Sequence, residues 1–309
     1  METNTFISAD GKTKIYYYIF RPKNKPRAIV QITHGMMDHI LRYNDLIERL
    51  NNESVVVCGC DDLGHGETGK NSKYGFFAKK NGPKYVVEDL HTLTSIIKEQ
   101  YKDIPFFLIG HSMGSFFARL YAYKYPEELN GLMLLGTSGK VAGTNFALLL
   151  LNFLIMFKGK EGYANKIEEL STKTYYKYVD KVETGREWVT SNPVKFQEYL
   201  NDPKCGFRFT LGAYKDMIST LKFVSSNKWF KKIKRELPIF LASGVCDPVG
   251  QYGTGVSEVF KRLEKTDHIN LQLKLYEDAR HELHNEIPLI ANEFFNDVLA
   301  WINHQIEQL

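Results

Sequence analysis

Short apolar runs recur along this chain with helical patterns between them, and this alternation limits the fold more than any other feature. Each run has a usual strand length, and its apolar composition indicates that both faces of the strand are covered. Helical spacing fills residues 43–50, 85–101 and 115–124. Strands that alternate with helices predict an α/β fold with a mostly parallel central sheet flanked by helices. The apolar runs are residues 28–32, 55–60, 106–109, 132–135, 239–242 and 271–275.

The alternation stops between residues 138 and 236, where the spacing is mostly helical, and it resumes at residue 237. A chain of 309 residues has room for two domains or for one domain with an insertion. We expect a core of residues 1–137 and 237–309, interrupted by a helical cap, or lid, of residues 138–236. An amphipathic pattern over residues 288–309 predicts a closing helix.

The N-terminal stretch contains Asp10-Gly11 between two alternating segments. This dipeptide favours a type I′ turn, in which both central residues have positive φ. We therefore expect a β-hairpin there.

The composition excludes several classes of protein. The formal charge of +4 gives no warrant for nucleic-acid binding, which requires a concentrated basic face. Four cysteines in a chain without a secretory signal argue against a disulfide framework and predict a cytoplasmic location. The longest apolar run, residues 146–157, is shorter than the roughly twenty residues that a membrane span needs.

The strongest motif is Gly110-His111-Ser112-Met113-Gly114, which follows a predicted strand and precedes a predicted helix. This is G-x-S-x-G in the context that its mechanism requires, because the sharp turn exposes the serine hydroxyl at the sheet edge. The helix N-terminus behind the serine favours developing negative charge. We expect Ser112 to be a catalytic nucleophile.

A nucleophilic serine needs a base and an acid that orients the base, and in this architecture they follow in the order Ser, Asp or Glu, His. Asp247 follows the strand at 239–242, where we expect an exposed carboxylate in a loop, and His281 follows the last strand. An oxyanion hole needs two convergent N–H donors. The Met113 amide follows the nucleophile, and the Met36 amide lies in the loop after the strand at 28–32.

These residues sit in stretches that resemble the monoacylglycerol lipase and lysophospholipase group of α/β-hydrolases, which is classed with serine aminopeptidase-like S33 proteins. The resemblance implies an α/β-hydrolase fold, a mobile lid, no cofactor, and ester substrates with an acyl chain. It also implies that Asp38, Arg42 and His284 hold the polar head of the substrate. Asp38 departs from the glutamate of many members. The matching stretches are residues 34–43, 61–68, 110–114, 244–249 and 276–284.

Two other patterns have simpler explanations. Residues 64–70 fit G-x-x-x-x-G-K, but Asn71 stands where a phosphate loop needs Ser or Thr to bind magnesium. His281 and His284 are three residues apart in a loop, whereas the zincin pattern places two histidines four apart on a helix. We expect no metal.

Two segments of the cap leave alternatives open. Residues 146–157 are apolar nearly all round, so we expect them to bury more than one face. They form either the packed core of the lid or an acyl-binding wall that also touches a membrane or micelle. The basic run at 228–235 is either a solvated helix face or a contact for anionic lipid.

We therefore predict a serine hydrolase that cleaves carboxylic esters of acyl lipids, monoacylglycerols or lysophospholipids, through an acyl-enzyme. The alternatives are a serine peptidase of the aminopeptidase-like branch and a non-catalytic α/β-hydrolase that only binds ligands. The peptidase would need an acidic pocket for a free α-amino group. The non-catalytic alternative conflicts with the presence of all three triad residue types.

Overall fold

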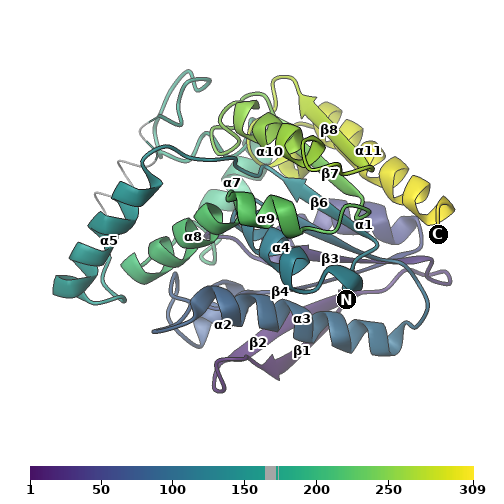
Figure 1. Ribbon diagram of the computed structural model, residues 1–309, viewed down its shortest axis with the longest axis horizontal. Helices are drawn as coiled ribbons and strands as arrows, with labels where there is room; N and C mark the ends of the chain where they lie inside the picture. The colour runs from purple at the N-terminus through teal and green to yellow at the C-terminus, as the bar shows by residue number, and fades with distance from the viewer. Residues whose placement is uncertain (164–171, 173) are drawn as a thin grey trace.

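Eight strands form a single sheet in the computed structural model, which describes residues 1–163, 172 and 174–309 (Figure 1). The strand order is β1-β2-β4-β3-β5-β6-β7-β8, with β1 and β2 antiparallel to their neighbours and the other pairs parallel. This is the mostly parallel sheet of an α/β-hydrolase, as predicted. The strands are β1 (Glu2–Ile7), β2 (Lys14–Phe20), β3 (Ala28–Thr33), β4 (Val55–Cys60), β5 (Phe106–His111), β6 (Gly131–Leu135), β7 (Ile239–Gly244) and β8 (Leu271–Tyr276).

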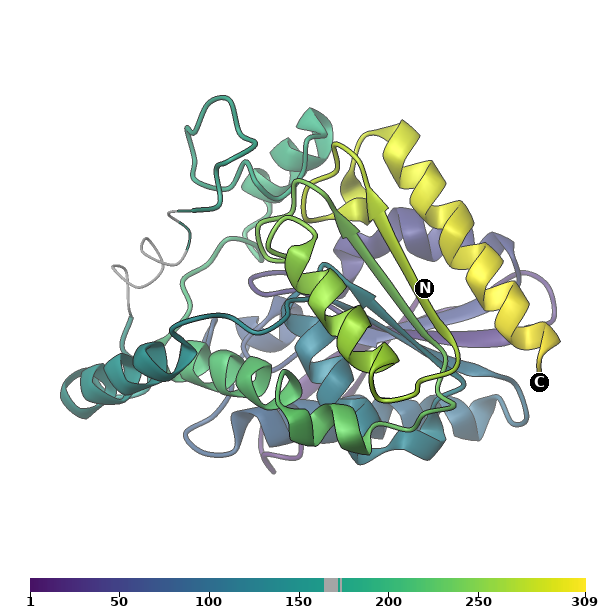
Figure 2. The ribbon, with the colours of Figure 1, turned by 45° about the horizontal axis from the view of Figure 1, so that its top comes forward.

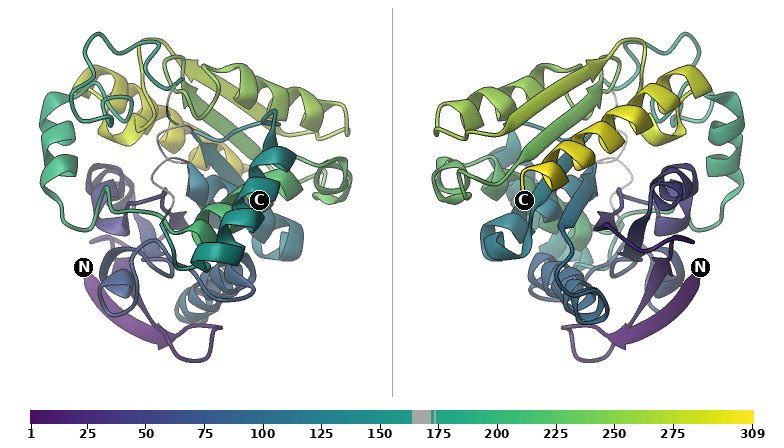
Figure 3. Two further views of the ribbon diagram at one scale, coloured as in Figure 1. Left: turned by 90° about the vertical axis from the view of Figure 1, so that its left-hand side faces the viewer. Right: turned by 90° about the vertical axis from the view of Figure 1, so that its right-hand side faces the viewer.

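Helices cover both faces of the sheet, which explains why its central strands are apolar throughout (Figure 3). In β5, Phe106 and Leu108 pack with α3, α4 and α10, while Phe107 and Ile109 pack with α1 and α11 on the other face. The edge strand β8 differs from the prediction, because most of its side chains are only partly buried. The helices flanking the sheet are α1 (Asn44–Asn52), α2 (Gly66–Lys70), α3 (Gly82–Gln100), α4 (Met113–Lys124), α10 (Thr254–Glu264) and α11 (Pro288–Glu307).

The N-terminal hairpin is present, but its turn is not of type I′. Gly11 has a φ of 79°, whereas Asp10 is not among the residues with positive φ. The Asp10 carboxylate instead accepts hydrogen bonds from the backbone N–H groups of Lys12 (2.8 Å) and Thr13 (2.7 Å). A local side-chain bond of this kind stabilises a wider loop than the two-residue turn predicted from the dipeptide.

The chain between β6 and β7 contains four described helices and an irregular stretch over residues 174–192, and part of it, residues 164–171 and 173, lies outside the described residues. Helix α5 lies beside α8, and α8 packs against α4 of the core (Figure 2). No helix in the described residues combines the length and apolar composition needed to cross a membrane. The described helices here are α5 (Thr144–Lys158), α7 (Pro193–Asn201), α8 (Leu211–Val224) and α9 (Asn227–Lys232).

Helix α5 contradicts the expectation that it buries more than one face. Leu151 is its one fully buried residue, and five of its large apolar side chains are exposed. Among the described elements, α8 makes the most extensive contact with α5, which lies at the outer edge of the molecule (Figure 2). The exposed side chains are Phe146, Leu149, Phe153, Met156 and Phe157, which are 56–78% exposed.

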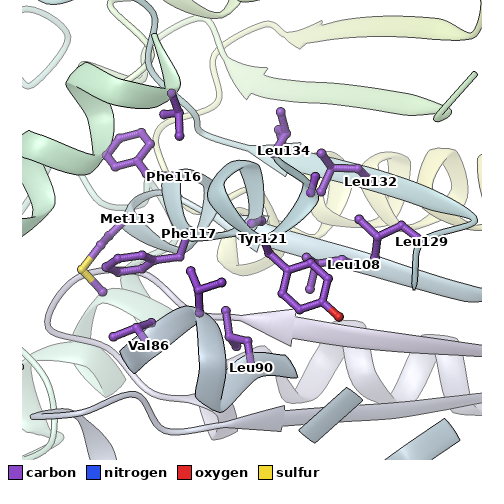
Figure 4. Close-up of a cluster of buried hydrophobic side chains, with 14 of the residues drawn as sticks. Val86, Leu90, Leu108, Met113, Phe116, Phe117, Tyr121, Leu129, Leu132 and Leu134 are labelled. Atoms are coloured by element: carbon purple, nitrogen blue, oxygen red, sulfur yellow. The ribbon is translucent and has the colours of Figure 1, made fainter. Parts of the chain in front are cut away.

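Helix α4, which begins directly after Ser112, is held firmly in the core. Its residues Phe117 and Tyr121 pack among side chains from α3 and the sheet (Figure 4). Arg119 is fully buried, donates a hydrogen bond to the Ser138 carbonyl at 3.0 Å, and donates a second to the Val224 carbonyl. Ser138 follows β6 and Val224 ends α8, so the nucleophile helix fixes both of these points of the intervening segment.

Candidate active site

Ser112 occupies the sharp turn between β5 and α4, with a φ of 53° and a ψ of −122°. This is a conformation that non-glycine residues rarely adopt, and such strain is concentrated at functional sites. The small residues around it are required by close packing. A Cβ at Gly110 would lie 2.6 Å from the Ala118 Cβ, and one at Gly114 would collide with the Thr33 carbonyl oxygen.

Asp247 and His281 are joined by a hydrogen bond of 2.9 Å between Oδ1 and Nδ1. The Asp247 carboxylate also accepts hydrogen bonds from Ser243 Oγ (3.0 Å) and the Val249 N–H (2.8 Å). It is completely buried, so the expectation of an exposed carboxylate was wrong. Burial allows this carboxylate to act on the imidazole with little competition from water.

The surroundings of His281 favour its protonated form. Burial lowers the pKa of His281, but the charge and hydrogen bond of Asp247, together with Glu282 and Asp38, outweigh burial and raise it above its ordinary value. The bond to Asp247 also fixes the tautomer, since it requires hydrogen on Nδ1 and leaves the Nε2 lone pair available to accept a proton.

Ser112 and His281 line one cavity of about 410 Å³. Among the described residues, the Ser112 hydroxyl makes no hydrogen bond, and such contacts often tighten only when substrate is bound. The cavity lining combines apolar side chains from α8, the start of α4 and the chain around the start of α5 with charged and polar side chains. The apolar residues include Phe116, Val141, Ala147, Met217, Ile218 and Leu221, and the charged or polar ones include Asp38, Arg186, Tyr199 and Glu282.

Met36 and Met113 line the same cavity beside Ser112. Within the described part of the chain, neither backbone N–H donates a hydrogen bond, so both are available to a ligand. Gly35 makes this approach possible, because a Cβ there would lie 3.2 Å from His111 Nδ1 and 3.4 Å from Ser112 Cβ.

Of the three residues expected to hold the substrate's polar head, only Asp38 lines the cavity. Arg42 lies behind it, with both terminal nitrogens bound to Glu282 at 2.6 Å and one bound to Asp38 at 3.2 Å. His284 is 1% exposed and stacks on the Tyr43 ring at 4.2 Å. Arg42 and His284 thus lie outside the cavity lining, and Asp38 and Glu282 share the Arg42 guanidinium.

The family model described as serine aminopeptidase, S33, matches residues 24–288, which include every element that carries Ser112, Asp247 and His281. The chain belongs to this family. Across 97% of its length this S33 chain is 25% identical to the monoglyceride lipase of Rattus norvegicus and covers 90% of that protein. It is 26% identical to the human monoglyceride lipase, again over 97% of its length and 89% of the relative's.

Solved structures place the S33 chain among esterases and lipases. A thermostable carboxyl esterase from Bacillus coagulans, solved with glycerol, superposes with a TM-score of 0.92 at 35% identity, covering 99% of this chain and 98% of that one. A structure described as a lipase in its open form superposes with a TM-score of 0.90 at 27% identity, covering 99% of both chains. The chain is thus a serine hydrolase of the esterase and lipase type with the α/β-hydrolase fold.

Four residues of this S33 hydrolase were missed from the sequence although they touch the predicted site residues. Tyr43 and His111 are hydrogen-bonded to each other at 2.8 Å, and Glu282 holds Arg42. The Trp188 ring lies 5.2 Å from the His281 ring. His111 and Glu282 could have been suspected, because each is adjacent to a predicted catalytic residue. Tyr43 and Trp188 carry no such signal.

Three potential metal-binding side chains of the S33 hydrolase gather away from the predicted triad: His39, Asp202 and Cys205. His39 Nε2 is already hydrogen-bonded to Asp202 at 2.8 Å. The pKa of the Cys205 thiol is raised, and burial is the largest cause. A metal would need this thiol as thiolate. The group fits better as a polar contact between the loop after β3 and the chain after α7.

Proposed function

We propose that this protein hydrolyses carboxylic esters of acyl lipids, with monoacylglycerols or lysophospholipids as substrates, through an acyl-enzyme on Ser112. The observation that carries the proposal is the cavity at Ser112, whose lining combines a group of apolar side chains with the carboxylates of Asp38 and Glu282, both paired with Arg42. An acyl chain gains free energy from burial against apolar side chains. A hydrated alcohol or headgroup suits the charged and polar part of the lining. The relatedness to monoglyceride lipases supports the same substrate class.

The predicted triad and oxyanion-hole residues each have a role in this reaction. Ser112 Oγ attacks the ester carbonyl, and His281 Nε2 accepts the hydroxyl proton and delivers it to the leaving alcohol. Asp247 holds the imidazole tautomer and stabilises the imidazolium. The Met36 and Met113 N–H groups stabilise the oxyanion. Water then attacks the acyl-enzyme by the same route in reverse, so the chemistry requires no cofactor.

The segment between β6 and β7 supplies the apolar end of the cavity through α5 and α8. We assign residues 138–236 as a cap on the core formed by residues 1–137 and 237–309. The exposed apolar face of α5 supports transient contact of this cap with a membrane or micelle, from which acyl lipids must be taken.

A peptidase of the aminopeptidase-like branch is the second candidate. Two carboxylates, Asp38 and Glu282, line the cavity and could in principle receive an α-amino group. Both are already paired with the Arg42 guanidinium, which is buried with them. A cationic substrate group would have to compete with this ion pair, so the geometry favours ester substrates.

Two experiments test the proposal. A fluorophosphonate probe should label the wild-type protein and should fail to label Ser112→Ala. Absence of labelling on folded wild type would reject the enzyme, and labelling that survives Ser112→Ala would reject the nucleophile. Hydrolysis of a monoacylglycerol series should exceed that of aminoacyl-anilides, and the reverse order would favour the peptidase.

A further inference from the structure

The Tyr43 hydroxyl connects two loops behind the predicted catalytic residues. Tyr43 is fully buried, and its hydroxyl oxygen accepts a hydrogen bond of 3.2 Å from the Gly35 N–H. The same hydroxyl lies 2.8 Å from His111 Nδ1, and His111 Nε2 lies 3.2 Å from the carbonyl oxygen of His281. A continuous chain of hydrogen bonds therefore runs from the residue before Met36 to the backbone of the predicted base.

The direction of each hydrogen bond in this chain follows from the groups themselves. A carbonyl oxygen only accepts, so His111 Nε2 must carry a hydrogen and donate it to His281. Burial, assisted by the neighbouring His281, lowers the pKa of His111 to about 4, so the ring is neutral at neutral pH. Its Nδ1 then has a lone pair that can accept the hydrogen of the Tyr43 hydroxyl.

Asp38 is the competing acceptor for this hydrogen, with Oδ2 at 3.0 Å from the Tyr43 hydroxyl. The Asp38 carboxylate has other donors, because Oδ1 receives the His39 N–H at 2.8 Å and Arg42 Nη1 at 3.2 Å. His111 Nδ1 has no donor other than Tyr43 among the described residues. The hydroxyl hydrogen therefore serves two acceptors, Asp38 Oδ2 and His111 Nδ1, and neither atom has another donor among the described residues.

The packing around the hydroxyl leaves little room to compensate for its loss. The Tyr43 ring stacks on His284, and the His111 ring lies 4.7 Å from the His281 ring. Removing the hydroxyl would leave the Gly35 N–H and His111 Nδ1 unpaired in a region closed to water. An unpaired buried polar group costs about 1–3 kcal/mol, so the two loops would shift to find other partners.

We propose that Tyr43 is a positioning residue, whose hydroxyl holds the Met36 loop and the His281 backbone at the separation that acylation of Ser112 requires. It does not line the cavity and touches no reacting atom. This role rests on the proposed function, because it presupposes that Ser112 and His281 carry out the reaction.

The test compares Tyr43→Phe with Tyr121→Phe. Tyr121 is also fully buried, and its hydroxyl donates a 3.0 Å hydrogen bond to Thr94 Oγ1 in the cluster of Figure 4, away from the cavity. Both variants lose one buried hydroxyl and keep the ring. We expect similar decreases in melting temperature for the two. In Tyr43→Phe alone, kcat should fall on the order of tenfold or more with KM within about twofold, since small misplacements of catalytic groups are costly.

Three outcomes would overturn the proposal: an unchanged kcat in Tyr43→Phe, a change in KM alone, and equal losses of kcat in the two tyrosine variants. A second pair of variants tests the chain at His111. The amide of His111→Gln can replace both hydrogen bonds, so it should retain more activity than His111→Ala, and equal losses would contradict the proposal.

The rate of fluorophosphonate labelling separates this proposal from the proposed function. Labelling of wild type that depends on Ser112 but is equally fast in Tyr43→Phe would reject only the positioning role. Absence of Ser112-dependent labelling in wild type would reject the function itself.

Discussion

Two parts of the segment between β6 and β7 are attached to the core in opposite ways. Residues 186–192 are bound to the loop of residues 279–286 that carries His281, which we call the histidine loop. The Glu282 N–H donates to the Val189 carbonyl at 2.9 Å, and Thr190 Oγ1 donates to the Asn285 carbonyl at 2.7 Å. Helix α5, in contrast, buries only Leu151 fully and exposes five large apolar side chains.

The segment between β6 and β7 is therefore held to the core unevenly along its length. Segment 186–192 places Trp188 beside His281. Hydrogen bonds join this segment to residues on both sides of His281, so it is held in place together with the predicted base. Helix α5 contributes Ala147 to the cavity while its outer face has no protein to pack against in the described structure.

The strongest test of the attachment between segment 186–192 and the histidine loop is Glu286→Ala. The Glu286 carboxylate is buried and accepts hydrogen bonds from the backbone N–H groups of Arg280 (2.8 Å) and Ser191 (3.2 Å), as well as from the Ser191 hydroxyl. Its removal leaves buried donors unpaired on both segments, so we expect a loss of about 4 kcal/mol in the free energy of unfolding. Urea unfolding measures it, with Glu286→Gln, which keeps one acceptor oxygen, as the milder control. A loss below about 1 kcal/mol would show that the two segments are not joined here.

The sequence was sufficient to predict the sheet and the places of the site residues. Buried strands are recognisable from their apolar runs, and Ser112, Asp247 and His281 each follow such a run in a known order. Parallel strands bring their carboxyl ends to one edge, so order along the chain predicts proximity in space. The burial of Asp247 could not be predicted, because it depends on Ser243 and on packing from other loops.

Contacts between segments far apart along the chain were beyond prediction from one sequence. The composition of α5 suggested burial on several faces, but only a neighbour can bury a face, and the path of the chain decides which neighbours a helix has. The Arg42–Glu282 pair joins residues 240 positions apart, and no local pattern marks such a partner. Trp188 meets His281 for the same reason only in three dimensions.

Acid unfolding tests how much the charge of Glu282, in the histidine loop, contributes to the free energy of unfolding. Burial raises the pKa of Glu282, but the Arg42 guanidinium overcomes burial and lowers it from 4.5 to about 2. A lowered pKa means stabilisation that is complete above pH 4.5 and is lost as the pH falls toward 2. The shift corresponds to on the order of 3 kcal/mol. The difference in unfolding free energy between wild type and Glu282→Gln should therefore shrink from pH 5 to pH 2, and a constant difference would contradict the ion pair.

Trp188→Phe tests whether segment 186–192 acts on the base or merely packs. Trp188 is 8% exposed and lines the cavity beside His281. Trp301 is 3% exposed and packs on the face of the sheet that α1 and α11 cover. Both tryptophan-to-phenylalanine variants should lose about 1–2 kcal/mol of unfolding free energy, because each leaves a partial cavity. Only Trp188→Phe should also lower kcat/KM for a soluble ester, by roughly tenfold. Equal activity of the two variants would reduce segment 186–192 to a packing element.

The smallest change in stability is expected at α5, and it would define the other half of the comparison. Phe157 is 71% exposed, so Phe157→Ser should change the unfolding free energy by less than about 0.5 kcal/mol. Leu151→Ser, on the buried side of the same helix, is the matched control and should cost several times more. Hydrolysis of a short, soluble ester should be unchanged in Phe157→Ser, while hydrolysis of a long-chain monoacylglycerol in micelles should fall by about threefold, because an apolar contact with the lipid surface is lost. A loss of stability comparable to that of Leu151→Ser would mean that this face is packed. Rates of Phe157→Ser equal to those of wild type on both substrates would mean that the face does not contact lipid.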